Sequence, residues 1–501
     1  MNSTLKIIIS SKKNLFAKYG KNFAKIEKHL TDLVNSDLKR NLSTSIIYID
    51  DEKSISRYGI KSIKNITRRN CKKIVDKIYN TLNPAYLVIF GSQDIIPFME
   101  IINPADDDDS IVPSDLPYAC DSPYGSDIKS FIGPSRVVGR IPDIPGKVDL
   151  NYLSTVFATI INFKQLNEEK FLEYFAVSTD SWKISTHKSL VNIFGNANKL
   201  KISPPSNSGY TLDNLKPLTH FYNCHGSPAD ANFYGQKDNN YPIAQYSGDL
   251  VGKITKGTIV AAECCYGAEL YDPEFNDQQD LGIALTYLYN KAISFLGSST
   301  IAYGPSTGQG LADLITQYFI KHVIAGASSG RALLEARQEF LKKSGPHLDP
   351  YELKTLAQFY LLGDPSIAPV KEAIMEGGAD SVENRRLKLF SKGLDLKSSI
   401  MPSKRIEKSE SKSAKKYSNE IKDIFKLVNF SGKEKQSEYV VSTKGRKISA
   451  LAKSMSGNEQ ISFRTFIKDT EVITNKIKSV DVLVLKQSGN KLLGWRLYHR
   501  K

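Results

Sequence analysis

The chain has 501 residues, 41% of them hydrophobic, and this length excludes a small module with a single core. No stretch approaches the roughly 18 to 20 consecutive apolar residues that a membrane span requires, and residues 1–20 lack the apolar segment of a secretory signal. We therefore expect a multidomain globular protein that is cytoplasmic and has no membrane span.

The cysteine content agrees with a reducing compartment. The chain has five cysteines, an odd number, and two of them are adjacent: Cys71, Cys120, Cys224, Cys264 and Cys265. A disulfide scaffold instead uses an even number of spaced cysteines. We therefore expect free thiols.

Short apolar or β-branched runs follow one another through the first 370 residues and alternate with helical patterns. The runs lie at 6–9, 45–49, 86–90, 174–177, 220–224, 258–262 and 293–296. Continuous apolar runs of this length are typical of strands buried in a parallel sheet. The pattern predicts an α/β fold with a mainly parallel sheet flanked by helices. Prolines between 104 and 145 break any long element, so we expect two α/β lobes, residues 1–165 and a catalytic lobe at 166–375.

The C-terminal quarter of the chain is basic. Residues 381–501 hold 28 Lys and Arg against 12 Asp and Glu, whereas the remaining residues hold 40 against 41. We interpret 376–420 as a charged linker and 421–501 as a small β-rich or α+β basic accessory domain. The charge suggests a regulatory protein or a nucleic acid as partner, although no zinc-finger or RNP-type motif accompanies it. We expect truncation after about Lys371 to leave a soluble folded body, with the basic segment affecting activity or partner binding instead of folding.

Two segments carry reactive side chains at the ends of predicted strands. Residues 218–227 read LTHFYNCHGS, so that a strand ends at His225, and residues 258–268 read TIVAAECCYGA, so that a later strand ends at the cysteine pair. The carboxyl ends of neighbouring parallel strands meet in one crevice. A thiol becomes nucleophilic when a nearby base favours its thiolate, and adjacent glycines let a carbonyl approach backbone N–H donors.

This order of His-Gly and Cys-x-Gly resembles the cysteine peptidases that include caspases, legumain, clostripain, separase and gingipain. Further segments narrow the resemblance to the gingipain-like family: VIFGSQDIIP at 88–97, GRIP at 139–142, LGSSTIAYG at 296–304 and LLGDPS at 361–366. Together they cover roughly residues 6–370. The resemblance implies a caspase-like fold and a thiol protease that cleaves a protein or peptide substrate through a Cys-His dyad and an acyl-enzyme.

The resemblance also implies roles for individual residues. Cys265 matches the nucleophile and His225 the acid/base, with Gly226 and Cys265 donating the oxyanion N–H groups and Asp180 supporting the histidine. The expected substrate-binding residues are Tyr303, Glu263 and Asp280. Independently, adjacent strand residues point to opposite faces, so that only one of Cys264 and Cys265 can face the crevice.

The sequence argues against a simple basic specificity for the residue recognised before the scissile bond. Relatives that cut after Arg or Lys hold a pocket carboxylate shortly beyond the supporting acid, yet residues 181–192 contain no acid. A buried unpaired cation would cost several kcal/mol. Basic specificity would need a carboxylate from elsewhere, with residues 106–109 or Asp280 as candidates.

Several alternatives stay open. No cofactor is expected, although the acidic run 106–109 could bind calcium. A zinc site built from the cysteine pairs and His225 is disfavoured, because adjacent residues turn away from a common metal. The chain could instead be a catalytically silent scaffold, or a nucleic-acid-associated protein that acts through its basic tail. By analogy with caspases, a peptidase of this kind could serve a regulated bacterial defence or signalling pathway.

Overall fold

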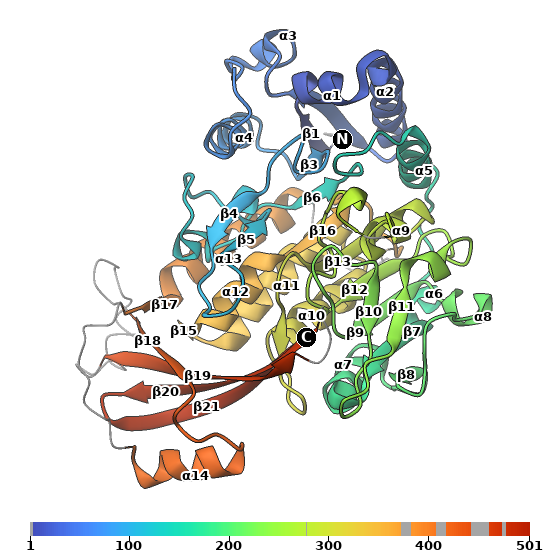
Figure 1. Cartoon of the computed structure of the whole chain (residues 1–501). Helices are drawn as coiled ribbons and strands as arrows, with labels where there is room; N and C mark the ends of the chain where they lie inside the picture. Colours follow the sequence, from blue (N-terminus) through green and yellow to red (C-terminus); the bar gives the residue numbers. More distant parts are fainter. Residues whose placement is uncertain (1–3, 277, 372–381, 407–416, 442–459, 473–476) are drawn as a thin grey trace, which may run out of the picture.

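The structure is a computed structural model that describes residues 4–276, 278–371, 382–406, 417–441, 460–472 and 477–501. A ten-stranded sheet forms the centre of the molecule (Figure 1). Its strands, in spatial order, are β2 (Leu42–Tyr48), β1 (Thr4–Ser10), β3 (Tyr86–Phe90), β6 (Val138–Ile141), β16 (Phe359–Gly363), β13 (Ser294–Ser298), β12 (Ile259–Ala262), β9 (Thr219–Asn223), β7 (Tyr174–Thr179) and β8 (Leu200–Ser203).

The sheet consists of two parallel halves that meet in one antiparallel pair. Strands β2, β1, β3, β6 and β16 run parallel to one another, and so do β13, β12, β9, β7 and β8. The halves join where β16 pairs antiparallel with β13. The first half holds four strands from residues 1–165 together with β16, the second half holds strands from residues 166–375, and the sheet is continuous across them.

Helices cover this sheet, and its strands are buried as their apolar composition predicts. β9, β12, β13 and β16 are buried along their whole length. The flanking helices are α1 (Lys12–Tyr19), α2 (Phe23–Lys39), α4 (Arg68–Leu82), α5 (Leu150–Ile161), α7 (Lys183–Phe194), α9 (Ile283–Tyr289), α10 (Ala312–Ile324), α11 (Ser329–Ser344) and α12 (Pro350–Gln358). The predicted α/β class with a mainly parallel sheet is therefore confirmed.

Short elements connect the main layers. They are α3 (Glu52–Ile55), α6 (Glu169–Leu172), α8 (Leu212–Leu215) and two small antiparallel pairs, β4 (Met99–Ile102) with β5 (Ile111–Ser114) and β10 (Asn232–Tyr234) with β11 (Ile243–Tyr246). No described helix is both long enough and apolar enough to cross a bilayer.

A second, mixed sheet of seven strands includes the C-terminal region. Its order is β14 (Tyr303–Gly304), β21 (Lys491–Arg500), β20 (Lys478–Ser488), β19 (Ile461–Val472), β18 (Lys435–Val441), β17 (Met401–Arg405) and β15 (His347–Leu348). Its two outer strands, β14 and β15, belong to the body of the protein, so the accessory region is joined to the body at both edges. Helix α14 (Asn419–Leu427) packs on this sheet through a small apolar cluster with Phe466 and Leu483.

Part of the range expected as a charged linker is ordered structure. Helix α13 (Val382–Ser399) packs against α11, and β17 follows it. Residues 376–381 and 407–416 of that range lie outside the described residues. The buried apolar cluster of the body continues through Leu396 of α13 into Tyr439, Val482 and Tyr498 of the second sheet.

Candidate active site

The pairing of β9 with β12 places the two predicted reactive residues, His225 and Cys265, opposite each other just beyond the ends of these strands. Ile259 of β12 pairs with Thr219 and Ala262 with Tyr222, so that this register, extended by three residues, places Cys265 beside His225. Neighbouring strands lie about 4.8 Å apart. The two chains stay adjacent beyond the strands, because Gly226 lies directly against the Cys265 backbone carbonyl and a Cβ atom would have no room there.

The two cysteines face different surroundings. The Cys265 sulfur accepts a hydrogen bond from the Ala302 N–H at 3.2 Å and lies 3.5 Å from the Ala302 carbonyl oxygen. The Cys264 thiol instead forms a hydrogen bond with Cys224 beneath the crevice. The five cysteines are all free and buried. Only Cys265 therefore has its sulfur on the side where the segment after β13 passes.

His225 is enclosed by aromatic rings and an amide. Its Nε2 lies 2.9 Å from Gln236 Oε1, and the Gln236 amide nitrogen donates to the Tyr241 hydroxyl at 2.7 Å, so that Nε2 carries the proton. Trp182 meets the imidazole edge-on with ring centroids 4.5 Å apart. Sequence reasoning did not identify Gln236, since no motif marks it.

Asp180 lies near this group without contacting the imidazole. Its carboxylate pairs with Lys183 at 2.8 Å, while its backbone N–H donates to the Gln236 carbonyl. Among the hydrogen bonds of the described residues none joins Asp180 to His225. The supporting role of Asp180 thus stays a prediction, and Gln236 is the side chain that holds the imidazole here.

Burial holds both reactive groups in their neutral forms. It raises the pKa of the Cys265 thiol to about 11, although the nearby Arg500 cation and the Ala302 N–H oppose this shift. Burial also lowers the pKa of His225 to about 4, against the hydrogen bond to Gln236, and the charges of Arg500 and Lys501 lower it further. Near neutral pH the site therefore holds a thiol and an uncharged imidazole.

A buried carboxylate pair lies beside the reactive residues. Glu263 and Asp313, the latter in the first turn of α10, both form ion pairs with the Lys501 ammonium, at 2.5 Å for Asp313. The same ammonium lies 5.6 Å from the centre of the Trp182 ring. We call Glu263, Asp313, Trp182 and Gly304 the lysine pocket, since a Cβ atom on Gly304 would collide with the Lys501 side chain.

The other predicted substrate-binding residues have different partners. The Asp280 carboxylate accepts a hydrogen bond from the Tyr246 hydroxyl at 2.8 Å. The Tyr303 ring is buried against Tyr351, with centroids 4.8 Å apart, whereas its backbone pairs with Arg500. The Lys501 ammonium lies over the Trp182 ring, and the prediction of Tyr303 as the aromatic face stays untested.

The acidic run 106–109 is neutralised by cations of the same chain. Lys354 lies 2.6 Å from both Asp107 and Asp109, and Arg500 lies 3.1 Å from Asp108. The Asp109 carboxylate also accepts from the hydroxyl of Tyr266, the residue after Cys265, and from the N–H of Ile301, the residue before Ala302. Within the described residues no group of three or more His, Cys, Asp or Glu could hold a metal ion.

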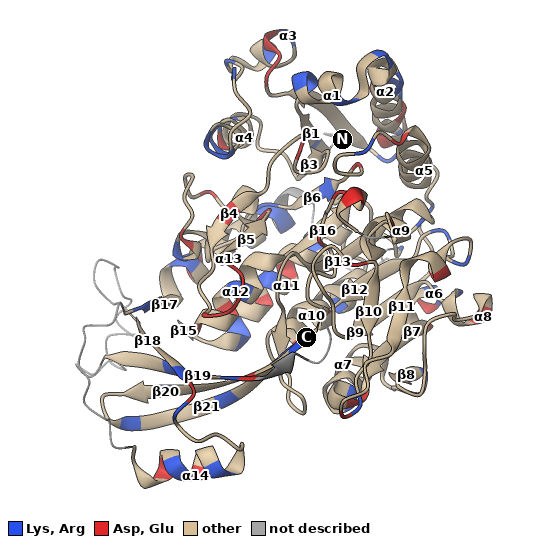
Figure 2. Cartoon of the chain, viewed as in Figure 1, with Lys and Arg blue, Asp and Glu red and all other residues tan. Residues whose placement is uncertain are grey.

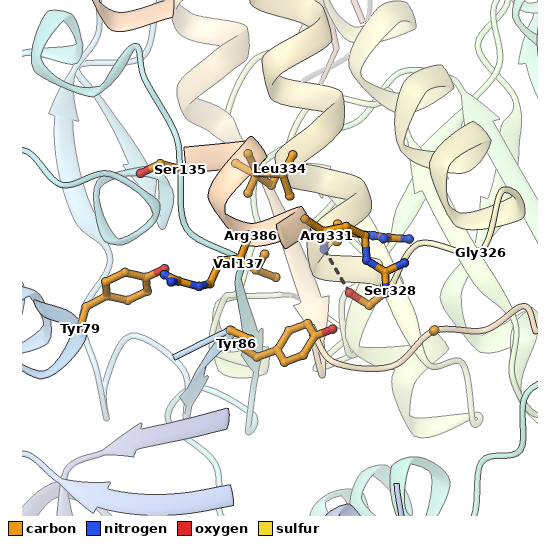
Figure 3. Close-up of a pocket in the computed structure, with 13 residues that line it drawn as sticks. Tyr79, Tyr86, Ser135, Val137, Gly326, Ser328, Arg331, Leu334 and Arg386 are labelled. Carbon is orange, nitrogen blue, oxygen red and sulfur yellow. Dashed lines mark hydrogen bonds between the residues drawn. The ribbon is translucent and has the colours of Figure 1, made fainter. Parts of the chain in front are cut away.

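A pocket apart from this crevice lies where α11 and α13 approach β3 (Figure 3). Tyr79, Tyr86, Arg331 and Arg386 are among its lining residues, and the Ser328 hydroxyl caps α11 by accepting the Arg331 N–H at 3.3 Å. Of the described residues that line it, none belongs to the predicted site.

A central, mostly parallel sheet with a Cys-His pair at its strand ends defines a cysteine peptidase fold of the caspase-like class. The sequence profile of peptidase family C25, the gingipain family, matches residues 6–370. The chain therefore belongs to this family, and the resemblance predicted from the motifs is confirmed. A search of curated proteins finds none that matches this chain.

Proposed function

We propose that the chain is a cysteine endopeptidase in which Cys265 is the nucleophile and His225 the acid/base. The observation that supports this most directly is the strand register that brings these two residues level at the carboxyl ends of β9 and β12. Membership of a cysteine peptidase family supports a protein or peptide as substrate.

In the proposed reaction the imidazole of His225 takes the proton of the Cys265 thiol, and the resulting thiolate attacks the carbonyl carbon of the scissile peptide bond. The C–N bond then breaks, and the imidazolium of His225 protonates the leaving amine. The backbone N–H groups of Gly226 and Cys265 are suited to stabilise the oxyanion, since no acceptor is found for either among the described residues. Water next hydrolyses the thioester, giving the carboxylic acid and restoring the thiol.

The test is hydrolysis of a positional-scanning peptide library by the purified full chain and two variants. Cys265→Ala should abolish turnover, whereas Cys264→Ala, which removes a sulfur facing Cys224, should retain most of it and unfold at a lower temperature. Loss of turnover in Cys264→Ala alone would overturn the assignment of the nucleophile.

The rival functions have less support. A silent scaffold would not require both Cys265 and His225 at matching strand ends. Many cations of the basic region are engaged within the chain, such as Arg496 with Asp349 and Glu352, and Lys435 with Asp106, which leaves fewer of them for nucleic acid. A cytoplasmic location is also a proposal, supported by the five free thiols.

A further inference from the structure

The segment that follows β20 reaches the candidate active site. Figure 1 shows β21 leaving the C-terminal sheet and ending beside α10 of the peptidase body. There β21 pairs antiparallel with β14, Tyr303 opposite Arg500 and Gly304 opposite His499. The Lys501 N–H then donates to the Ala302 carbonyl at 2.9 Å.

This last hydrogen bond places the Lys501 backbone one peptide unit from the nucleophile. Ala302 accepts from Lys501 through its carbonyl and donates to the Cys265 sulfur through its own N–H. Trp182 provides a second link, because its ring contacts both the His225 imidazole and the Lys501 ammonium. A strand in this position lies where a substrate would have to pass to reach Cys265.

The Lys501 side chain is held as a specific ligand would be. It is completely buried in the lysine pocket, where its ammonium meets the carboxylates of Glu263 and Asp313. Two buried carboxylates without a cation are costly, so the pocket is built for a positively charged group. Gly304 provides the space that the side chain crosses.

The residue before Lys501 has a charged partner as well. The Arg500 guanidinium pairs with Asp108 of the acidic run, and Lys478 of β20 lies 3.4 Å from the same carboxylate. Figure 2 shows basic residues along the strands of the C-terminal sheet, and several of them meet acidic residues of the body. The strand is thus docked by complementary charge in addition to backbone pairing.

We propose that residues 498–501 occupy the substrate-binding crevice of the peptidase in cis, with Lys501 in the pocket for the residue before the scissile bond, so that the site stays closed until this strand withdraws. This proposal rests on the proposed peptidase function. It adds to that function a mode of regulation and a class of substrate. Glu263 and Asp313 are then the specificity-determining residues, and the open enzyme prefers substrates with lysine at that position.

The test compares the full-length chain with Lys501→Ala and with the matched control Lys491→Ala, an exposed change on the same strand. The readout is the rate at which iodoacetamide alkylates Cys265, measured by mass spectrometry of its peptide. We expect at least a tenfold faster reaction in Lys501→Ala and no change in Lys491→Ala. Cys71 and Cys120, buried elsewhere in the core, report whether the variant has simply unfolded.

A second part of the experiment adds the sequence of residues 498–501 back to Lys501→Ala as a separate peptide. An acetylated peptide Tyr-His-Arg-Lys, the sequence of residues 498–501, added to Lys501→Ala should again protect Cys265, and Tyr-His-Arg-Ala should not. Two results would overturn the proposal that residues 498–501 occupy the crevice. One is an equal rate of Cys265 alkylation in the wild type and both variants, and the other is equal protection of Cys265 by the two peptides.

Neither readout requires catalysis, so the two proposals can fail separately. If Cys265 is alkylated faster in Lys501→Ala but no lysine peptide is hydrolysed, the crevice is occupied by residues 498–501 as proposed, and the endopeptidase proposal is wrong. Hydrolysis at the same rate and KM in the wild type and Lys501→Ala would retain the endopeptidase and overturn the occupancy. In the open enzyme, Glu263→Gln should reduce the preference for lysine over a neutral residue at least tenfold, and an unchanged preference would refute the pocket assignment.

Discussion

Gly226 lies so close to the backbone carbonyl of Cys265 that no side chain fits between the two strand ends. We therefore expect Gly226→Ala to push His225 away from Cys265, to reduce peptide turnover at least tenfold and to destabilise the fold by about 1–3 kcal/mol. Gly125→Ala is the matched control, since a Cβ atom there would meet nothing within 4 Å. Turnover kinetics and thermal melts measure both effects, and wild-type activity in Gly226→Ala would contradict the proposed closeness of the two chains.

Gln236 holds the His225 imidazole, so it should control both the rate and its pH dependence. Gln236→Leu removes the acceptor of the Nε2 proton and should lower kcat by roughly tenfold to a hundredfold. Gln236→Glu places a negative charge there, which favours the imidazolium and raises the pKa of His225. The acid limb of the pH–rate profile should move to higher pH in Gln236→Glu alone. A profile identical to that of the wild type would mean that Gln236 does not face the working imidazole.

Asp107 and Asp109 share the Lys354 ammonium but differ in their other contacts. Asp109 also accepts from Tyr266, which follows Cys265, and from Ile301, which precedes the Ala302 that donates to the Cys265 sulfur. We expect Asp109→Asn to reduce turnover at least tenfold and Asp107→Asn to reduce it much less, since both variants lose one charge beside Lys354 while only Asp109 bonds to the segments that carry Cys265 and Ala302. Kinetics of the two purified variants give the comparison, and equal losses would refute it.

Burial of neutral histidines predicts acid sensitivity of the fold. Burial lowers the pKa of His220 from 6.5 to about 3, so that protons bind to the unfolded chain first as the pH falls. This contribution to stability is complete above about pH 6.5 and is lost progressively between pH 6.5 and 3. At pH 4.5, two units below the unfolded pKa, His220 alone should lower the free energy of unfolding by about 3 kcal/mol. Denaturant unfolding at pH 7 and 4.5 should show a smaller difference in His220→Gln than in the wild type.

The continuous apolar core predicts that the body depends on the C-terminal region. The sequence predicts that the body folds alone after truncation at about residue 371, yet Leu348 and Tyr351 of the body are buried in the same cluster as Tyr439 and Tyr498. Deletion of 372–501 would expose these side chains. The truncated chain should therefore melt at a lower temperature or aggregate, which calorimetry and size-exclusion chromatography can measure. A truncated chain as stable as the full chain would contradict this interdependence.

Local patterns sufficed for the central fold and for the reactive pair. Buried strands are recognisable in the sequence as apolar runs, and His225 and Cys265 each lie at the end of such a run with a glycine close behind. The topological rule predicts that the two residues converge if their strands are neighbours, and the pairing of β9 with β12 meets that condition. Glu263 was predicted as a substrate-binding residue, and that role stays a prediction.

The residues of the lysine pocket could not be predicted from local sequence patterns. Asp313 begins a helix with no motif around it, and its partner Lys501 lies 188 residues away. Trp182 lies within residues 181–192, where the family resemblance predicts a pocket carboxylate and not an aromatic ring. The antiparallel pairing of β21 with β14 involves two residues of the body, too short a strand to recognise from sequence.

The anchoring of β21 determines how the proposed closure of the crevice affects KM and kcat. Eight residue pairs join β21 to β20, whereas only two join it to β14. Lys501 would therefore meet its pocket at an effective concentration fixed by the fold, commonly of millimolar order for tethered ligands. A substrate has to compete with this tethered ligand at every dilution of the enzyme. The closure would consequently appear as a raised KM with an unchanged kcat, independent of protein concentration.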